Sequence, residues 1–268
     1  MQILGCGLRD HPCFNKNSHG KFGRIHLPVA PRCNIQCAFC DRRFDCVNES
    51  RPGVTSELIS PEEAILRVAK AIAKEPLIRV AGIAGPGDPL ANPETFETLR
   101  GLRRSFPKLI LCLSTNGLLL EDSLEELLEA GVDTLTATIN AVTAETAAKI
   151  CTSVRIGGNE LPRLEGAKLL IEKQQRALAA CQKAHIPVKI NTILIPGVNN
   201  HEIKAVAQTA AHFDCAVMNI TPLIPCGDMS GNPAPTPEAV AATRREAGAY
   251  ISQMLHCRQC RADACGIV

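Results

Sequence analysis

Two neighbouring stretches decide the fold class predicted for this chain: Arg24-Ile-His-Leu-Pro-Val29 and, after three intervening residues, Cys33-Asn-Ile-Gln-Cys37-Ala-Phe-Cys40. The first is a short, mostly apolar run typical of a strand, and the second places three cysteines within eight residues. Thiolates at this spacing can wrap one small soft-metal centre. A [4Fe–4S] cube held by three thiolates keeps one iron without a protein ligand, and that iron can bind a small molecule. The two stretches therefore predict a strand that leads directly into an iron–sulfur loop.

Five further strand-like runs follow, separated by longer helical patterns. One helix is marked at its start by Ser60, with Glu63 three residues on, as in a capping box. The predicted strands are 24–29, 78–84, 109–114, 134–139, 188–194 and 216–220. The predicted helices are 61–74, 93–105, 123–130, 143–150, 163–184, 201–213 and 237–255.

This alternation predicts an α/β fold built from parallel βαβ units with right-handed crossovers. Such units fit both an open doubly wound sheet and a barrel. Turns rich in Gly, Pro, Asn, Asp or Cys follow almost every strand. Functional loops at the carboxyl ends of successive strands are typical of a barrel and favour it here. We expect a single domain: a partial (β/α)6 TIM-type barrel over 22–255, with Cys-bearing extensions at 1–21 and 256–268. The turns are 32–45, 85–89, 115–117, Asn140, 196–200 and 222–228.

Composition and charge argue against a nucleic-acid-binding, secreted or membrane-spanning protein. The formal net charge is +2, the chain has one Tyr and no Trp, and no basic block is interleaved with aromatic residues. Nucleic-acid binding is therefore not expected. The N-terminus lacks a charged segment followed by a long apolar one, and no window reaches about 18 uninterrupted apolar residues. We expect a soluble cytoplasmic protein that has no membrane partner.

Fourteen cysteines are many for a cytoplasmic chain, because disulfides are rare in that compartment. They are either inert buried thiols or ligands of metals and clusters. Cys151, Cys181 and Cys215 lie in strand-like or helix-like stretches rich in Ala and Val, and we interpret them as thiols without a role. Most of the others gather near Gly, Pro, His and one another.

The spacing CxxxCxxC, with an aromatic residue before the last cysteine, resembles the signature of the radical S-adenosylmethionine (SAM) superfamily. The resemblance implies that Cys33, Cys37 and Cys40 hold a [4Fe–4S] cluster whose open iron chelates the amine and carboxylate of SAM. Electron transfer from this cluster would then cleave SAM to a 5′-deoxyadenosyl radical. A zinc knot that uses Cys46 as fourth ligand is the alternative, although its spacing would be unusual.

Several other loops match, by the same resemblance, the segments that contact SAM. Gly85-Pro-Gly87-Asp88-Pro stands where radical SAM proteins carry a Gly-Gly-Glu-Pro-like segment for the methionine amine. Because this segment differs from Gly-Gly-Glu-Pro, either Asp88 or a backbone carbonyl can contact the methionine amine. Asn116-Gly117 also has the sequence of an ordinary turn. The expected SAM-contacting residues are Gly85, Gly87, Asp88, Thr115, Asn116 and Asn140.

Cysteines near the two ends of the chain suggest a second site. CxxC pairs are typical of cluster, zinc and redox sites alike, so their spacing does not identify the metal. If the two ends meet over one end of the barrel, Cys13, Cys257 and Cys260 form a second set of three thiolates. Cys265 could replace one of them, and Cys6 is a weaker candidate.

A third set of ligands can be built inside the barrel. His26 lies on the first predicted strand and Cys112 on the third, while Cys46 closes the cysteine loop with Glu49 three residues on. Each has a plainer interpretation: His26 as a satisfied core histidine, Cys112 as a packed thiol, and Glu49 as a carboxylate paired with Arg51.

Long motifs occur throughout the chain, and together they closely resemble the NifB family, the radical SAM maturases of the nitrogenase cofactor. Many bacterial members add a C-terminal cofactor-carrying domain, and this chain ends at Val268, so we expect a stand-alone form. The motifs are His11-Pro-Cys13, Val29-Ala-Pro-Arg-Cys33-Asn-Ile-Gln-Cys37, Cys46-Val-Asn-Glu-Ser-Arg-Pro-Gly53, Gly82-Ile-Ala-Gly-Pro-Gly-Asp-Pro-Leu-Ala-Asn-Pro93 and Cys257-Arg-Gln-Cys260-Arg-Ala-Asp-Ala264.

This resemblance implies a mechanism. Two [4Fe–4S] substrate clusters are held beside the SAM cluster, which makes three clusters in all. One SAM methylates a cluster sulfide, and a second generates the radical that abstracts hydrogen from that methyl group. The clusters then fuse around the carbon, with an added sulfide, into an eight-iron precursor of the nitrogenase cofactor. The by-products are S-adenosylhomocysteine, methionine and 5′-deoxyadenosine.

The resemblance also implies residue roles and partners. Glu49 and Cys46 are the expected catalytic residues, with Glu49 as a transient ligand or proton acceptor. The expected partners are an iron–sulfur cluster donor, a downstream scaffold or carrier protein and a reductant such as a ferredoxin. The alternatives are another radical SAM maturase with auxiliary clusters and a multi-cluster electron carrier. The carrier would need neither loop 85–89 nor loop 115–117, and would not consume SAM.

Overall fold

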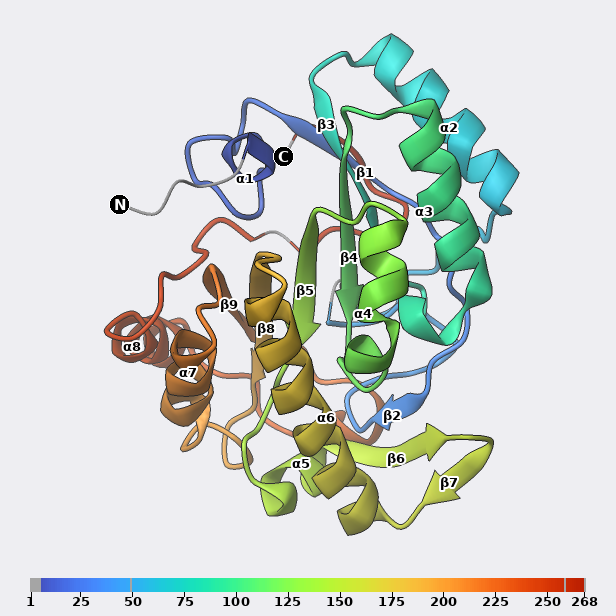
Figure 1. Cartoon of the computed structure of the whole chain (residues 1–268). Coiled ribbons are helices and arrows are strands. Elements are labelled where there is room, and N and C mark those ends of the chain that lie inside the picture. The colour runs from blue at the N-terminus through green and yellow to red at the C-terminus, as the bar shows by residue number, and fades with distance from the viewer. Residues whose placement is uncertain (1–5, 49, 258, 268) are drawn as a thin grey trace.

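A computed structural model of the chain shows one main sheet with helices along its outer face (Figure 1). The structure describes residues 6–48, 50–257 and 259–267, so the predicted catalytic residue Glu49 lies outside the described residues. Seven strands form the sheet in the order β10-β1-β3-β4-β5-β8-β9. Its six parallel strands follow one another in sequence order, as in a barrel and unlike a doubly wound sheet. The expected partial barrel of the α/β class is confirmed.

All six predicted strands are present, with small shifts at their ends. A further strand, β10 (Cys265–Ile267), runs antiparallel along β1. The parallel strands are β1 (Gly23–His26), β3 (Ile78–Ile83), β4 (Ile110–Thr115), β5 (Thr134–Thr138), β8 (Val188–Leu194) and β9 (Val217–Pro222).

The seven predicted helices are also present, and the capping box of Ser60 and Glu63 is confirmed. The last helix is shorter than predicted, because backbone groups of Ser252 and Met254 pair with Met218 of β9 at 2.9 and 2.8 Å instead of continuing the helix. The helices are α2 (Pro61–Lys74), α3 (Pro93–Ser105), α4 (Leu120–Glu129), α5 (Ala144–Ile150), α6 (Arg163–Lys183), α7 (Ile203–His212) and α8 (Pro237–Ala247), with the short helices α1 (Cys6–Arg9), η1 (Pro89–Ala91) and η2 (Gly227–Met229).

A second, three-stranded sheet was not predicted from the sequence. It pairs β2 (Ile35–Cys37), within the cysteine loop, with the hairpin β6 (Cys151–Ile156) and β7 (Asn159–Leu161). Gly157 and Gly158 form the hairpin turn with φ of 58° and 81°, a conformation that favours glycine. This sheet lies beyond the arrowheads of the main parallel strands (Figure 1).

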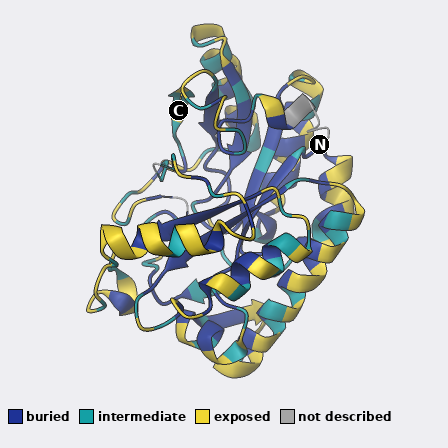
Figure 2. Ribbon diagram, turned by 90° about the vertical axis from the view of Figure 1, so that its left-hand side faces the viewer, coloured by how far each residue is buried: buried dark blue, intermediate teal, exposed yellow. Residues whose placement is uncertain are grey.

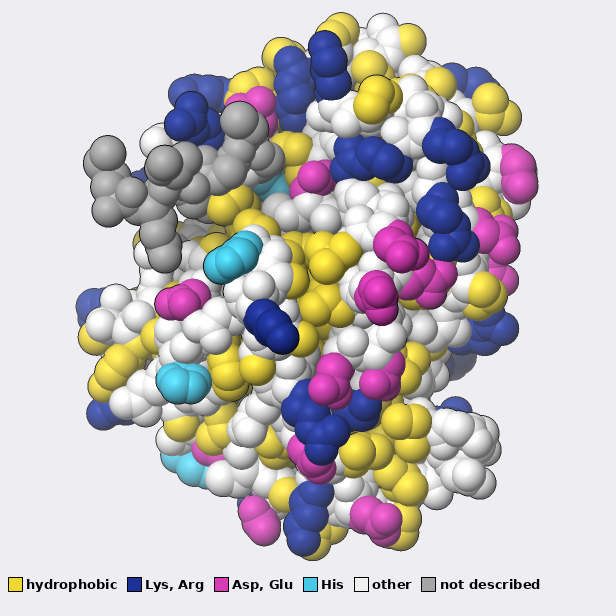
Figure 3. Space-filling model, viewed as in Figure 1, with side chains coloured by type: hydrophobic (Ala, Val, Ile, Leu, Met, Phe, Trp, Pro, Cys, Tyr) yellow, Lys and Arg dark blue, Asp and Glu magenta, His cyan; other side chains and the backbone are white. Residues whose placement is uncertain are grey.

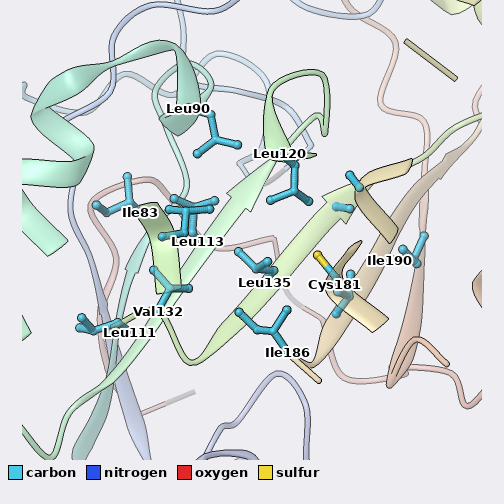
Figure 4. Close-up of a cluster of buried hydrophobic side chains, with 14 of the residues drawn as sticks. Ile83, Leu90, Leu111, Leu113, Leu120, Val132, Leu135, Cys181, Ile186 and Ile190 are labelled. Carbon is cyan, nitrogen blue, oxygen red and sulfur yellow. The ribbon is translucent and has the colours of Figure 1, made fainter. Parts of the chain in front are cut away.

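The main strands alternate between two environments. Apolar side chains on the outer face pack against the helices, as Figure 4 shows for Ile83, Leu113 and Leu135 on the strands with Leu120 and Ile186 nearby. Side chains of this core are nearly fully buried, and the strands are buried while the helices expose their outer sides (Figure 2). Burial of this apolar surface is the main stabilising contribution to the fold.

The inner face of the sheet is largely polar. His26 of β1, Gly82 of β3 and Cys112 of β4 lie side by side in register, and Thr136 of β5 pairs in register with Lys189 of β8. A TIM barrel usually fills this space with branched apolar side chains. The polar lining therefore indicates a site inside the barrel instead of a packed core.

The outer surface over α3, α4 and α6 carries basic and acidic side chains close together (Figure 3). Ion pairs there include Lys173 with Asp122 at 2.8 Å and Arg100 with Glu126 at 2.9 Å. In the described part of the chain, no helix combines the length and the apolar character that crossing a membrane requires.

Candidate functional site

The three cysteines of the loop line one cavity at the carboxyl end of the barrel strands. Cys37 lies on β2, where its backbone pairs with Cys151 of β6, and the amide of Cys40 donates to the carbonyl of Cys37 at 3.0 Å. Cys33 lines the same cavity. The sequence prediction that these three thiols share one site is therefore consistent with the structure.

The electrostatic environment of these thiols suits a cluster. Burial raises the pKa of Cys33 to about 12, and burial together with neighbouring thiols raises the pKa of Cys37 well above its ordinary value. Burial also raises the pKa of Cys40, although Arg42 opposes this effect. Buried thiols of this kind ionise only if positive charge is placed among them, and iron supplies that charge. The donor set thus fits an iron–sulfur cluster.

The loop after β3 lies against the backbone of the cysteine loop. The amide of Gly87 donates to the carbonyl of Ala30 at 2.5 Å, and the amide of Asp88 donates to the carbonyl of Arg32 at 2.9 Å. A Cβ atom on Gly87 would lie 2.1 Å from the same Arg32 oxygen. Gly87 therefore permits close approach to the cysteine loop. Gly85, at φ 139°, adopts a conformation that only glycine tolerates well.

Asp88 lines the cavity and ties two loops together. Its carboxylate accepts hydrogen bonds from the Thr115 hydroxyl at 2.9 and 3.0 Å, the Asn116 amide at 2.6 Å and the Leu90 amide at 3.0 Å. Burial raises the pKa of Asp88 to about 6, although these hydrogen bonds favour its charged form. The hydroxyl of Thr115 and the carboxylate of Asp88 are thus engaged with each other, while both residues still face the cavity.

A second cavity adjoins the first, and the two share Cys37 and Asn116 in their walls. Asn140 also lines it, with its side-chain oxygen accepting from the Ile193 amide at 2.8 Å. Cys151 lines it too, beside the backbone of Cys37. Cys151, which we interpreted as a thiol without a role, therefore lies within the site.

A third cavity lies in the barrel interior, and it shares Ala84 and Ser114 with the cysteine cavity. His26 and Cys112 line it, as predicted for the third ligand set. Cys46 lines the neighbouring cysteine cavity instead, so that predicted set is divided between two adjoining cavities. Among the described residues, no three His, Cys, Asp or Glu side chains converge closely enough to hold a single metal ion.

His26 is a buried imidazole with one ring nitrogen engaged in a hydrogen bond. Burial, assisted by the charges of Arg24 and Lys189, lowers the pKa of His26 to about 3. Its Nδ1 lies 2.9 Å from the carbonyl oxygen of Arg261, so this nitrogen carries the proton and Nε2 keeps its lone pair. Gly82 leaves room for the ring, because a Cβ atom there would lie 3.2 Å from Cδ2 of His26. Metal-binding histidines are commonly oriented by such a hydrogen bond.

The two ends of the chain meet beside the interior cavity, as the second ligand set requires. Nε2 of His256 lies 2.8 Å from the carbonyl of Pro12, and Cys257 packs against a small apolar cluster that contains Cys13. The guanidinium of Arg24 donates to the sulfur atoms of both Cys13 and Cys260. The structure therefore brings Cys13 and Cys260 together around one buried arginine.

Cys265 is exposed and lies on the edge strand β10. The charged groups that affect its thiol are Lys74, Arg67 and Glu75, all in or next to α2. Its proposed substitution for one of the terminal ligands is therefore not supported. The side chain of Cys6, the weaker candidate, lies outside the described part of the chain.

Several buried residues at the site were missed from the sequence. Arg24, His11 and Lys189 line the interior cavity, and Gln174 of α6 donates to backbone carbonyls of two strand ends at 2.7 and 3.0 Å. Arg24 could have been predicted from His26. Residues two apart on a strand face the same side, so a strand that points His26 inward also points Arg24 inward.

Comparison with known proteins identifies the family. The model of the radical SAM superfamily matches residues 27–210. The chain is 45% identical over 263 residues to the FeMo cofactor biosynthesis protein NifB of Methanocaldococcus infernus, which covers 97% of this chain and 86% of that protein. It is 44% identical to the NifB protein of Klebsiella pneumoniae, and it spans only 57% of that protein's length.

Solved structures agree in fold. Methylornithine synthase (PylB) aligns over 96% of this chain and 78% of its own, with a TM-score of 0.56 at 16% identity. The radical SAM methyltransferase TsrM of Kitasatospora setae aligns over 76% of this chain and 36% of its own, with a TM-score of 0.52 at 15% identity. Likeness at this level of identity concerns the fold alone. With the family model and the curated relatives, it leads to one conclusion: this chain belongs to the radical SAM superfamily of enzymes and, within it, to the NifB family.

Proposed function

We propose that this chain acts in biosynthesis of the nitrogenase cofactor by fusing two [4Fe–4S] clusters, with a SAM-derived carbide and a sulfide, into an eight-iron precursor. One observation carries the proposal. The cysteine cavity and the interior cavity adjoin through Ala84 and Ser114, and the interior cavity is lined by thiols and imidazoles. A SAM molecule bound at the first cavity would therefore face a substrate held in the second.

The SAM site uses the loops at the carboxyl ends of the strands. Cys33, Cys37 and Cys40 hold the resident cluster, which when bound supplies the electron for SAM cleavage. Asp88 and Asn116 fix the loops around it through their hydrogen bonds. The adjoining cavity combines apolar walls with side-chain amides, which suits the adenosine and methionine parts of SAM.

The substrate clusters occupy the interior and the meeting point of the chain ends. Cys13, Cys257 and Cys260 hold one cluster. His26 and Cys112 hold the other, with Cys46 as a ligand on the side of SAM. A neutral imidazole is a weaker ligand than a thiolate, so a site with His26 would release iron more readily during fusion. Glu49, three residues after Cys46 in the sequence, serves as a transient ligand or proton acceptor.

The partners we propose are a donor of iron–sulfur clusters, a reductant such as a ferredoxin, and a scaffold or carrier that takes the product. We place the reaction in the cytoplasm. In support, the thirteen cysteines whose side chains are described are all free thiols.

The test measures iron and SAM products after anaerobic reconstitution. We expect about twelve irons per chain, as for three cubanes, against about four for a SAM cluster alone. S-adenosylhomocysteine and 5′-deoxyadenosine should both form in the presence of a reductant. Deoxyadenosine alone would indicate another radical SAM maturase, and no SAM consumption would indicate an electron carrier.

A pair of cysteine variants sharpens this test. Cys112→Ala removes a thiol that faces the interior cavity, whereas Cys181→Ala removes one from the apolar core on the other side of the sheet. We expect Cys112→Ala to lose iron and S-adenosylhomocysteine formation while it keeps the SAM cluster. Cys181→Ala should match the wild type. Equal iron content in both variants would contradict the proposed substrate site.

A further inference from the structure

Arg24 is a buried cation that lies between two thiols, Cys13 from the N-terminal part of the chain and Cys260 from the C-terminal part. It lies on β1 and is only 8% exposed. Its Nη1 donates to the sulfur of Cys13 and its Nη2 to the sulfur of Cys260, while its buried Nε has no hydrogen-bond partner among the described residues. None of the ion pairs in the described ranges includes Arg24. A buried charge of this kind is costly unless an anion compensates it.

His11 presents a second buried N–H group beside the same thiols. Its ring is 1% exposed, and Nδ1 accepts a hydrogen bond from the amide of Cys13 at 3.1 Å. In a neutral ring the proton must then be on Nε2. This Nε2 is buried and has no partner in the described part of the chain, and His11 lines the interior cavity with Arg24. The edge contact with Phe14, at 4.7 Å between ring centres, holds the ring in place.

The interior cavity is complementary to an anion with soft acceptor atoms. Arg24 and Lys189 contribute positive charge to its wall, and no Asp or Glu is among the described residues that line it. Asp263, a carboxylate that acts on His26, is paired with Arg261 at 2.7 Å. A [4Fe–4S] core with thiolate ligands is negatively charged, and its sulfur atoms accept hydrogen bonds.

We infer that Arg24 and His11 are positioning residues that receive the substrate cluster held by Cys13 and Cys260, by donating N–H hydrogen bonds to its thiolate and sulfide sulfur atoms. The inference rests on the proposed function. The planar guanidinium reaches both thiols at once and so fixes their separation, which an ammonium group could not do. Hydrogen bonds to sulfur favour the more reduced, more negative cluster and raise its reduction potential.

The experiment uses the full chain, reconstituted anaerobically with iron and sulfide. Arg24→Gln, Arg24→Lys and His11→Phe are compared with the wild type and with Arg103→Gln. Arg103 is a matched control because it is partly buried on α3 and donates to backbone carbonyls and Asp133 on the outer side of the sheet. Two quantities are measured: the reduction potential of each cluster by EPR-monitored titration, and the rate of iron loss to a chelator.

In Arg24→Gln we expect one auxiliary cluster to shift to a lower potential and to lose iron about tenfold faster, which corresponds to about 1.4 kcal/mol. The SAM cluster of the same molecule should keep its potential and serves as internal reference. His11→Phe should shift the same auxiliary cluster by a smaller amount. Arg24→Lys keeps the positive charge but loses the planar guanidinium that reaches two sulfur atoms, so we expect an intermediate shift of the reduction potential. Arg103→Gln should leave all potentials unchanged.

Failure of this inference and failure of the proposed function give different results. A wild type that binds about four irons per chain would overturn both. A wild type with about twelve irons, and an Arg24→Gln protein with unchanged potential and iron loss, would overturn the inference alone. If Arg24→Gln does not fold, Arg24→Lys decides: potentials equal to those of the wild type would then refute the inference.

Discussion

The close approach of Gly87 to the cysteine loop predicts that Gly87→Ala damages both the fold and the SAM cluster site. An added Cβ atom would lie 2.1 Å from the carbonyl oxygen of Arg32 and 2.9 Å from that of Pro31. Both oxygens belong to the backbone, so neither can rotate away as a side chain would. Gly87 does not have a positive φ, and crowding alone therefore makes alanine costly.

The structure gives the size of the effect. Ordinary contact begins at 3.4 Å, so the two backbone segments would have to separate by about 1.3 Å. Two hydrogen bonds span the same gap, from Gly87 to Ala30 at 2.5 Å and from Asp88 to Arg32 at 2.9 Å. Weakening both costs about 2 kcal/mol, and overpacking adds about 1–3 kcal/mol. The expected loss of about 3–5 kcal/mol lowers Tm by about 6–20 °C.

The assay is thermal unfolding followed by circular dichroism, with iron counted after anaerobic reconstitution. Gly231→Ala is the matched control, because a Cβ atom there meets nothing within 4 Å and its φ is not positive. We expect Gly231→Ala to unfold within about 1 °C of the wild type. The reasoning is refuted if Gly87→Ala unfolds at the same temperature as Gly231→Ala and loads its SAM cluster normally.

Three further predictions concern the cysteine loop, the interior histidine and a buried carboxylate. Cys37→Ala should abolish reductive SAM cleavage, because two thiolates cannot hold the cube; deoxyadenosine formation in this variant would contradict the cluster assignment. In pulsed EPR of the reduced protein, a nitrogen coupling to a cluster should vanish in His26→Ala while the SAM-cluster signal persists, and its retention would make His26 a core histidine. Glu202 accepts hydrogen bonds from the amides of Val142 and Thr143 at 2.8 and 3.1 Å. Burial alone would raise the pKa of Glu202, but these bonds and those from threonine hydroxyls lower it below 4.5. Its ionised form therefore stabilises the fold above pH 4.5, and this contribution is lost as the pH falls through the lower folded pKa. The unfolding free energy of Glu202→Gln should thus lie about 2–3 kcal/mol below that of the wild type at neutral pH, with a smaller gap in acid; a gap that does not change with pH would count against this account.

Features encoded by neighbouring residues could be predicted from the sequence. The helix that starts after Ser60 was predicted with its observed bounds, because the capping box and the apolar periodicity are local signals. The parallel βαβ units followed from the order of strands and helices, and the polar and cysteine-bearing turns after the strands favoured the barrel over an open sheet. The grouping of Cys33, Cys37 and Cys40 followed from their spacing alone.

Features that depend on distant pairing could not be predicted in this way. The strand from Cys151 to Ile156 follows directly on a helix, and its partner β2 lies more than a hundred residues earlier in the chain. The tail after Ala247 continues a helical pattern in sequence, yet its backbone pairs with β9. Arg24 was read as part of an apolar run, because its thiol partners come from the two ends of the chain.

Pairing of β2 with β6 bears on how the cysteine loop behaves when a cluster on its three thiols is lost. The segment Ile35–Cys37 pairs antiparallel with Val154, Ser153 and Cys151, and this main-chain pairing does not involve the thiols of the cysteine loop. The amide of Ala38 adds a bond to the carbonyl of Ile150 at 2.7 Å. Because this pairing is made by the main chain, we expect the loop to keep its shape if a cluster on the three thiols is lost to oxygen. Reloading with iron and sulfide should then require no prior refolding.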